Sequence, residues 1–346
     1  MKQLLTITLF LLWGKMALAG HITGGEMYYT YVGMSNGQYQ YNVTLKLYKR
    51  CNISTAFPDP AIISVFAKMD QSRFGDFYVP MTRSENINLT NVNPCISHPP
   101  LVCFDIAYYS FTLLLPGSPM GYTISSQVNF RINGMNNLTA GYSGIGATYT
   151  AEIPGTTAPA TGIQNNSARF TGTDLVLVCT GNNFSYSFAA TDPDGDQLYY
   201  RFCSAYRSTS QGGSAPPPEA PPYQSIPYNT PAYSESQPMG AGITLNSNSG
   251  LLHGIAPAAG QYVVTVCVEE TRRGTIIATQ RKDIQINVAD CSITSAVLKP
   301  EYLLCDTSQT IFLFNESGSS GIQSSTWEVR DASNNLLYPY NGDTLQ

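Results

Sequence analysis

The chain has 346 residues, which is long enough for two or three domains of ordinary size. Only 12% of the residues are charged and the formal net charge is −5, so the chain lacks the basic surface that nucleic acid or an anionic membrane would require. Tyr, Thr, Ser, Asn and Gly are abundant. Because Tyr and Thr favour strands while Gly and Asn favour hairpin turns, the composition predicts an all-β fold.

The first 19 residues have the features of a secretory signal peptide. Lys2 precedes an apolar run over 4–13, and a small-residue A-x-A cleavage site ends at Ala19. This run is too short to span a bilayer, and no later stretch reaches about 18 apolar residues. We therefore expect residues 1–19 to be removed and the mature protein to be exported, with no integral membrane segment in this part of the chain.

All eight cysteines follow the signal peptide. An even cysteine count in an exported chain indicates disulfides rather than metal or redox chemistry. Because eight cysteines allow about a hundred connectivities, spacing alone does not determine the pairing. The pairings that we expect are Cys95 with Cys103, which closes a short Pro-containing loop, and Cys291 with Cys305, across the last predicted domain boundary.

Residues 20–168 are predicted to form a first β-sandwich. Asn36-Gly37 is a strong hairpin signal between two Tyr-rich stretches. After it, odd positions from Tyr39 to Leu47 are apolar and even positions through Lys46 are polar, which is the alternation of a half-buried strand. Further candidate strands are 62–67, 76–81, 104–115, 122–133 and 147–153. About seven strands with one apolar and one polar face indicate a sandwich.

A Gly/Thr/Ala/Pro-rich passage over 155–166 marks the first boundary, and residues 169–290 are predicted to form a second sandwich. The near-continuous apolar run over 262–266 suggests a strand that is covered on both sides or lies at a domain contact. A Pro-rich stretch over 208–240 has almost no aliphatic residues, so we expect a loop that extends over the surface. This loop is either a ligand-binding rim or a tolerated insertion between two strands.

Residues 291–346 are predicted to begin a third sandwich. Two strand-like stretches lie on either side of a Ser/Gly-rich loop, but the strands are too few to close two sheets. We therefore expect this third sandwich to be incomplete and the chain to be a fragment of a longer protein.

The most distinctive chemistry lies in the run Phe188–Tyr200, where Asp192, Asp194 and Asp196 alternate with Pro193 and Gly195. Two short strands joined by an acidic turn at the rim of a sandwich would produce this pattern. Oxygen-only ligands on a flexible loop suit Ca²⁺ better than Zn²⁺ or Mg²⁺, so the three aspartates are candidate calcium ligands. The alternative is a metal-free turn, since Asp accepts backbone N–H bonds and Gly supplies a positive φ.

Signals for catalysis were not found. The three histidines are scattered, and neither a nucleophile elbow, a phosphate-binding loop nor a dinucleotide fingerprint is present. Glu269 and Glu270 alternate faces on a predicted strand, so at most one of them approaches the acidic turn. We therefore expect that this chain is not an enzyme.

Several stretches resemble the N-terminal region of gliding-motility-associated bacterial surface proteins that are exported by the type IX secretion route. The resemblance is carried by His21–Glu26, Leu45–Cys51, Ala189–Tyr200 and the stretches 260–270 and 281–291. It implies tandem Ig-like or cadherin-like domains, a long C-terminal array and a C-terminal sorting domain that attaches the protein to the cell surface.

Two shorter resemblances concern single modules. The stretch from Cys291 through Phe314 to Trp327 resembles a PKD-like repeat. The A-x-D-x-D…L-x-Y pattern around the acidic turn is similar to a cadherin repeat, and this similarity implies Asp192 and Asp194 as calcium ligands.

Together these features predict a non-catalytic extracellular surface segment, adhesin-like or surface-filament-like, that acts in cell-surface display and in adhesion or gliding. The partner would be a cell-surface or extracellular glycan or protein. The alternative is a carbohydrate-binding module of an exported multidomain hydrolase, in which exposed aromatic rings stack on sugars. The chain has 23 tyrosines, which permits this alternative, although tyrosine is also a favoured strand residue.

Overall fold

The computed structural model describes residues 22–89, 96–97, 101–129, 131, 134–139, 145–160, 162–208, 216–293, 312–314, 324–342 and 344–345. This part of the chain is all β, as predicted, with one short 3-10 helix, η1 (Gly162–Gln164). Two compact units are present: unit 1 extends to Leu89 and resumes over Val102–Val288, and unit 2 comprises Thr90–Leu101 and Ala289–Gln346. The predicted signal peptide lies outside the described residues.

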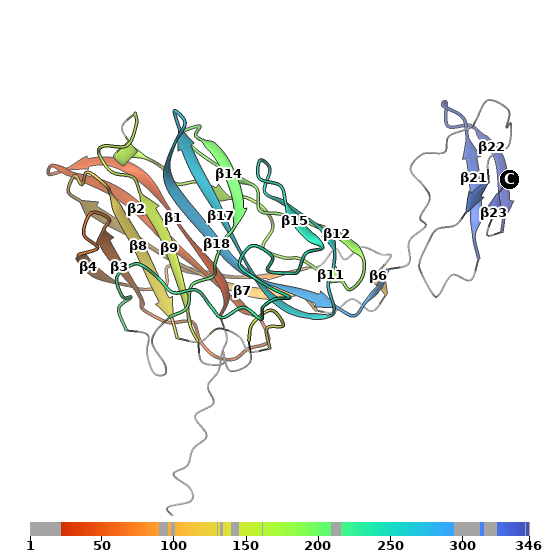
Figure 1. The fold of residues 1–346 in the computed structure, drawn as a ribbon, viewed down its shortest axis with the longest axis horizontal. Coiled ribbons are helices and arrows are strands. Elements are labelled where there is room, and N and C mark those ends of the chain that lie inside the picture. The colour runs from red at the N-terminus through yellow and green to blue at the C-terminus, as the bar shows by residue number, and fades with distance from the viewer. Residues whose placement is uncertain are drawn as a thin grey trace, which may run out of the picture. The chain divides into compact units, whose positions relative to one another are not determined.

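Unit 1 contains three antiparallel sheets and one short strand pair (Figure 1). The main sheet has eight strands in the order β14 (Gln197–Phe202), β17 (Gly260–Arg272), β18 (Thr275–Ala289), β1 (Ile22–Ser35), β2 (Gln38–Arg50), β7 (Cys103–Leu115) and β5 (Arg83–Asn88), with β11 (Val178–Cys179) also paired with β18. The second sheet has the order β4 (Arg73–Val79), β3 (Ala61–Ala67), β8 (Tyr122–Val128) and β9 (Ala147–Ile153). The third sheet has the order β12 (Asn183–Ser187), β16 (Leu251–Ile255) and β15 (Ile243–Leu245), and β10 (Arg169–Phe170) pairs with β13 (Ala190–Thr191).

The main sheet joins strands from both of the sandwiches that the sequence predicts. Strand β1 pairs with β2 on one side and with β18 on the other, where Gly25 lies opposite Asp283 and Glu26 opposite Lys282. Gly24 permits this approach, because a Cβ atom there would collide with the carbonyl oxygen of Asp283. The described parts of 20–168 and 169–290 that belong to unit 1 therefore form one compact unit with a shared sheet, and residues 90–101 and 289–290 fall to unit 2.

Unit 1 has two large hydrophobic cores on opposite faces of this sheet. The first core lies between the main and second sheets and contains Leu47 and Ile124. The second core lies between the main and third sheets and contains Tyr48 and Leu252. Because successive side chains of a strand point to opposite faces, the neighbours Leu47 and Tyr48 enter different cores. The face of β2 predicted to be polar is thus partly covered rather than open to solvent.

Strand β17 is covered on both faces, which confirms the prediction from its apolar run. Tyr262 and Val264 enter the second core, while Val263 packs in a smaller cluster that includes Met135 and Ile226. Ile226 belongs to the Pro-rich stretch 208–240 and is only 3% exposed. The described part of that stretch therefore covers the main sheet with its few aliphatic residues, so the expectation of a purely superficial loop was incomplete.

Unit 2 contains short strand pairs. These are β6 (Ile96–Ser97) with β19 (Ser292–Ile293), β20 (Leu313–Phe314) with β23 (Thr344–Leu345), and the hairpin β21 (Thr326–Arg330) with β22 (Leu336–Asn341). Trp327 is buried, and its Nε1 atom donates a hydrogen bond to the carbonyl oxygen of Gly342 at 2.6 Å. Among the described residues of both units, no helix is long and apolar enough to cross a membrane.

Two disulfides join strands that are neighbours in the main sheet. Cys51 bonds to Cys103, with Cα atoms 5.6 Å apart, and Cys203 bonds to Cys267, with Cα atoms 5.9 Å apart. The predicted pairing of Cys95 with Cys103 is therefore wrong. The antiparallel register places the end of β2 beside the start of β7, which favours the partner that is distant in sequence.

Two further cysteines, Cys179 and Cys291, are also disulfide-bonded. Cys95 and Cys305 lie outside the described residues. The pairing of Cys291 with Cys305 therefore stays a prediction.

Candidate functional site

The acidic turn comprises residues 192–196 and connects β13 to β14. The Oδ1 atom of Asp192 accepts hydrogen bonds from the backbone N–H groups of Asp194 and Asp196, at 2.8 and 3.1 Å. Gly195 adopts a φ of 80°, which suits a turn residue. One carboxylate oxygen from each of the three aspartates lies within 4.8 Å of the others, so the predicted clustering of the three carboxylates is confirmed.

The side chain of Arg272, at the end of β17, supplies a positive charge to this turn. Its Nε and Nη2 atoms donate to the two carboxylate oxygens of Asp196 at 2.7 and 2.6 Å, and Nη2 lies 3.2 Å from Asp194 Oδ2. The backbone and side-chain amides of Asn166 donate to both oxygens of Asp194, at 2.7 and 2.6 Å. The turn is thereby fastened to the main sheet and to the segment between η1 and β10.

These contacts determine how well the turn suits a calcium ion, which requires about six to eight oxygen ligands. Within the described residues, only Asp192 Oδ2 among the six carboxylate oxygens is buried without a hydrogen-bond partner. Burial raises the pKa of this carboxyl group, and the charges of Asp196 and Asp194 raise it further. A calcium ion bound by Asp194 and Asp196 would have to displace the Arg272 guanidinium. The residues present fit a turn neutralised by arginine better than a calcium loop, and the calcium site stays a prediction.

Glu270 is buried directly behind the acidic turn. Its side chain is fully buried, and its oxygens accept hydrogen bonds from Asn165 Nδ2 at 2.6 Å, the backbone N–H of Ala168 at 2.8 Å and Gln280 Nε2 at 3.1 Å. Burial raises the pKa of Glu270 to about 7, although these hydrogen bonds oppose the shift. The neighbouring Glu269 faces the other way and pairs with Arg201 at 2.6 Å, which confirms that the two glutamates alternate faces.

A second group of ionisable side chains, which we name the charge cluster, lies in the middle of the main sheet. It comprises Glu26, Lys46, Tyr48, Asp174 and Lys282. In the register of the sheet, Glu26 on β1 is directly opposite Lys46 on β2 and directly opposite Lys282 on β18. Three adjacent strands thus place a carboxylate between two ammonium groups on one face of the sheet.

Asp174, from the segment between β10 and β11, completes the charge cluster. Its Oδ1 atom lies 2.6 Å from Lys282 Nζ and its Oδ2 atom lies 2.5 Å from Lys46 Nζ. The hydroxyl oxygen of Tyr48 lies 2.6 Å from Glu26 Oε1 and 3.0 Å from Asp174 Oδ1, and its single hydrogen is shared between these two acceptors. Glu26 Oε1 is 3.4 Å from Lys46 Nζ and 3.8 Å from Lys282 Nζ. The two acids and two lysines balance each other in charge.

Burial and charge act in opposite directions on these groups. Burial alone would lower the pKa of Lys282, but the nearby carboxylates of Glu26 and Asp174 outweigh it and raise that pKa. Burial would raise the pKa of Asp174, but the lysines lower it. Burial, reinforced by both carboxylates, holds the pKa of the Tyr48 hydroxyl well above its usual range, so this group stays a donor.

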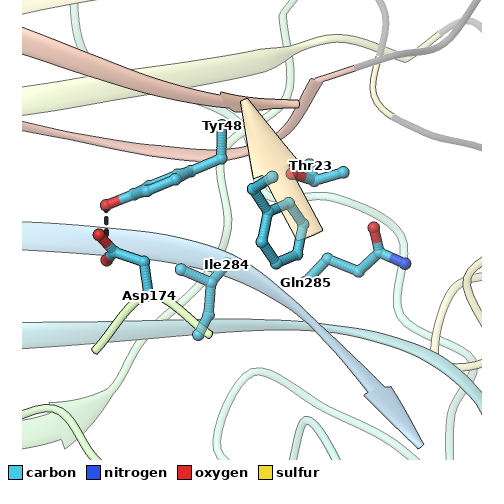
Figure 2. A pocket seen from close by; sticks show the side chains of 6 residues that line it. Thr23, Tyr48, Asp174, Ile284 and Gln285 are labelled. Carbon is cyan, nitrogen blue, oxygen red and sulfur yellow. Dashed lines mark hydrogen bonds between the residues drawn. The ribbon is translucent and has the colours of Figure 1, made fainter. Parts of the chain in front are cut away.

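A small cavity adjoins the charge cluster (Figure 2). Tyr48 and Asp174 line one side, joined by their hydrogen bond, and the other lining residues are Thr23, Phe104, Ile284 and Gln285. The cavity volume is about 10 Å³. This space suits a single water molecule rather than an organic ligand.

The charge cluster was not predicted from the sequence. Glu26, Lys46 and Lys282 lie on predicted strands, and Lys46 was assigned to a polar face. The available signal was the presence of single charged residues within long, otherwise uncharged or apolar strands. Bringing them together required the pairing of β1 with β18, which no local pattern specifies.

Comparison of the chain with protein-family models, with curated proteins and with solved structures found no match.

Proposed function

We propose that this chain is a non-catalytic segment of an extracellular surface protein, built from Ig-like or cadherin-like sandwiches, that presents a stiff surface in adhesion or gliding. The observation that carries this proposal is the main sheet, which forms one wall of both hydrophobic cores. The partner is an extracellular glycan or protein.

The sheet provides stiffness for a simple reason. Bending of unit 1 between its two cores would break backbone hydrogen bonds along β1, β2 and β18. It would also expose apolar side chains of the second core to water. The disulfides Cys51–Cys103 and Cys203–Cys267 restrain the same sheet, and disulfides persist in oxidising, extracellular surroundings. Such a body maintains the spacing between its surfaces under load, which suits display on a cell surface.

The test uses cells of the source organism. Antibodies against residues 22–288 are expected to label intact cells, and cells lacking these residues are expected to lose attachment or gliding. Labelling that appears only after the cells are permeabilised would refute the extracellular location. Unchanged attachment and gliding in the deletion strain, at normal levels of the remaining protein, would refute the adhesive role.

The second candidate function is carbohydrate binding, and one surface favours it. Phe74, Asp76 and Tyr78 alternate along β4 and are all exposed, with Phe74 at 42% and Tyr78 at 63%. Aromatic rings beside a carboxylate on an open strand provide a stacking platform and a hydrogen-bond acceptor for a sugar. In this reading the chain serves as the binding module of an exported hydrolase.

A glycan array with the mature chain tests this alternative. The variant Tyr78→Ala is expected to lose any binding that the parent shows. Tyr199→Ala is the matched control, because Tyr199 is an exposed tyrosine on a different sheet. Binding that survives Tyr78→Ala would exclude the β4 surface, and a blank array for the parent would leave the display function as the sole proposal.

A further inference from the structure

The charge cluster places a lysine amine, an aspartate carboxyl and a glutamate together in a buried site that the proposed function does not use. We propose that Lys282 and Asp174 form an intramolecular amide bond, with Glu26 as the proton-transfer group. This is a self-catalysed covalent modification of the chain. It needs no external reactant, because water is its only other product.

The distances favour the reaction between these two residues. Lys282 Nζ lies 2.6 Å from Asp174 Oδ1, within the range of a charge-assisted hydrogen bond. The Lys282 side chain is 2% exposed and that of Asp174 is 11% exposed, so bulk water has little access to either group. Holding two reactants in contact replaces a bimolecular encounter with an intramolecular step, which greatly raises the effective concentration.

Burial also changes the balance between ions and neutral molecules. In water a lysine and an aspartate stay charged and solvated, and this prevents condensation. In the site, burial by itself disfavours both charged forms, but the opposite charges of the cluster outweigh it, raising the pKa of Lys282 and lowering that of Asp174, so the neutral pair that reacts is the minor form. An amide bond would replace one buried ion pair by a neutral group, while Lys46 and Glu26 would remain as a balanced pair.

The hydrogen bonds of the charge cluster set the order of the step. A proton first moves from Lys282 Nζ to its partner Asp174 Oδ1, giving a neutral amine and a carboxylic acid. Nζ then attacks Cγ of Asp174, and a new C–N bond forms as the carbonyl electron pair moves to Oδ2. The Lys46 ammonium, 2.5 Å from Oδ2, stabilises the negative charge that develops there.

The tetrahedral intermediate then collapses. Glu26, with Oε1 at 3.8 Å from Lys282 Nζ, accepts a proton from the nitrogen. The Tyr48 hydroxyl lies 2.6 Å from Glu26 Oε1 and 3.0 Å from Asp174 Oδ1, so it relays this proton to Oδ1, the leaving oxygen. The Cγ–Oδ1 bond breaks as the carbonyl re-forms at Oδ2, one water molecule is released, and Glu26 returns to its original state. The adjoining cavity lined by Asp174 and Tyr48 has room for this water.

The bond would connect the segment before β11 to β18 across the second core. Lys282 is preferred to Lys46 because the Lys46 side chain is more exposed, at 13%. In addition, the Lys282 ammonium lies 5.7 Å from the centroid of the Phe170 ring, on an apolar side of the site. The result would be a cross-link that reducing agents do not break, in addition to the disulfides.

Mass spectrometry of the purified mature chain, after reduction and alkylation, tests the proposal. Trypsin cleaves after Arg169 and after Arg281, so the peptide 170–201 is expected to be joined to the peptide that begins at Lys282, with a mass lower than the sum of the two by one water molecule. Recovery of the unlinked peptide 170–201, together with cleavage after Lys282, would overturn the proposal. A link from Asp174 to Lys46 instead would overturn the choice of Lys282.

Two variants test the chemistry. Glu26→Gln preserves the volume of the side chain but removes the proton acceptor, so the linked peptide is expected to fall at least tenfold relative to the parent. Glu152→Gln is the matched control, because Glu152 pairs with Lys68 at 2.9 Å in a more exposed site and is expected to leave the link unchanged. An undiminished link in Glu26→Gln would overturn the role of Glu26. If that variant does not fold, Tyr48→Phe, which removes only the hydroxyl, must show slower link formation.

Discussion

Arg131 and Asp283 form a two-point ion pair that is almost completely buried. Arg131 Nη1 and Nη2 lie 2.9 and 2.7 Å from the two carboxylate oxygens of Asp283, and the side chains are 1% and 6% exposed. Asp283 directly follows Lys282 on β18, so adjacent residues of one strand send opposite charges to opposite faces of the sheet.

Removal of one member of this pair should be costly. Arg131→Met leaves the Asp283 carboxylate buried without its main counter-charge, and we expect the free energy of unfolding to fall by roughly 3–5 kcal/mol. Urea titration followed by circular dichroism measures this change. Arg83→Met is the control, since Arg83 is 59% exposed in its pair with Glu85, and a loss below about 1 kcal/mol is expected there. Equal losses in both variants would contradict this account.

Glu270 should make stability depend on pH. Its folded pKa of about 7 lies above the unfolded value, so its contribution is fully present below about pH 4.5 and is lost as the pH rises through 7. The loss amounts to about 3 kcal/mol at high pH. Glu270→Gln removes the titration, so the fall in unfolding free energy between pH 5 and 8 is expected to shrink. An unchanged pH profile in the variant would show that other groups cause it.

The Cys203–Cys267 disulfide closes a loop of 64 residues that includes the Pro-rich stretch. Such a loop restricts the unfolded chain, and the double variant Cys203→Ala, Cys267→Ala is expected to lose about 4 kcal/mol of unfolding free energy. The measurement is the denaturant midpoint under non-reducing conditions. A loss of unfolding free energy below about 1 kcal/mol would mean that the disulfide adds little to the strand pairing and packing that hold β14 against β17.

Calcium binding should depend on Arg272. Because its guanidinium occupies the oxygens of Asp194 and Asp196, we expect titration calorimetry to show stronger Ca²⁺ binding in Arg272→Ala than in the parent. Asp192→Ala in the Arg272→Ala background is the control and is expected to abolish the heat. Tight binding by the parent would show that the arginine yields to the metal, and binding by neither protein would end the calcium hypothesis.

The sequence predicted those parts of the fold that local patterns encode. The period-two alternation in β2 identified the residues of the first core, and Asn36 and Gly37 both adopt the positive φ values, 50° and 76°, that the hairpin signal requires. The clustering of the three aspartates in the acidic turn was likewise local, since all lie within five residues.

The sequence did not predict features that depend on which strands, far apart in the chain, pair with each other. Glu26 and Lys282 are 256 positions apart in sequence, and only the pairing of β1 with β18 makes them neighbours. The partner of Cys103 and the arginine at the acidic turn were missed for the same reason. Alternation specifies which way a side chain points, but it does not specify which strand lies alongside.

The position of β1 has a consequence for how the protein reaches its native state. The strand at the start of unit 1 lies between β2 and β18, and β18 is the last long strand of that unit to be synthesised. Contacts of such large sequence separation form slowly. The main sheet therefore cannot close until nearly the whole unit has emerged from the ribosome, and until then the edge of β1 that pairs with β18 waits for a partner that does not yet exist.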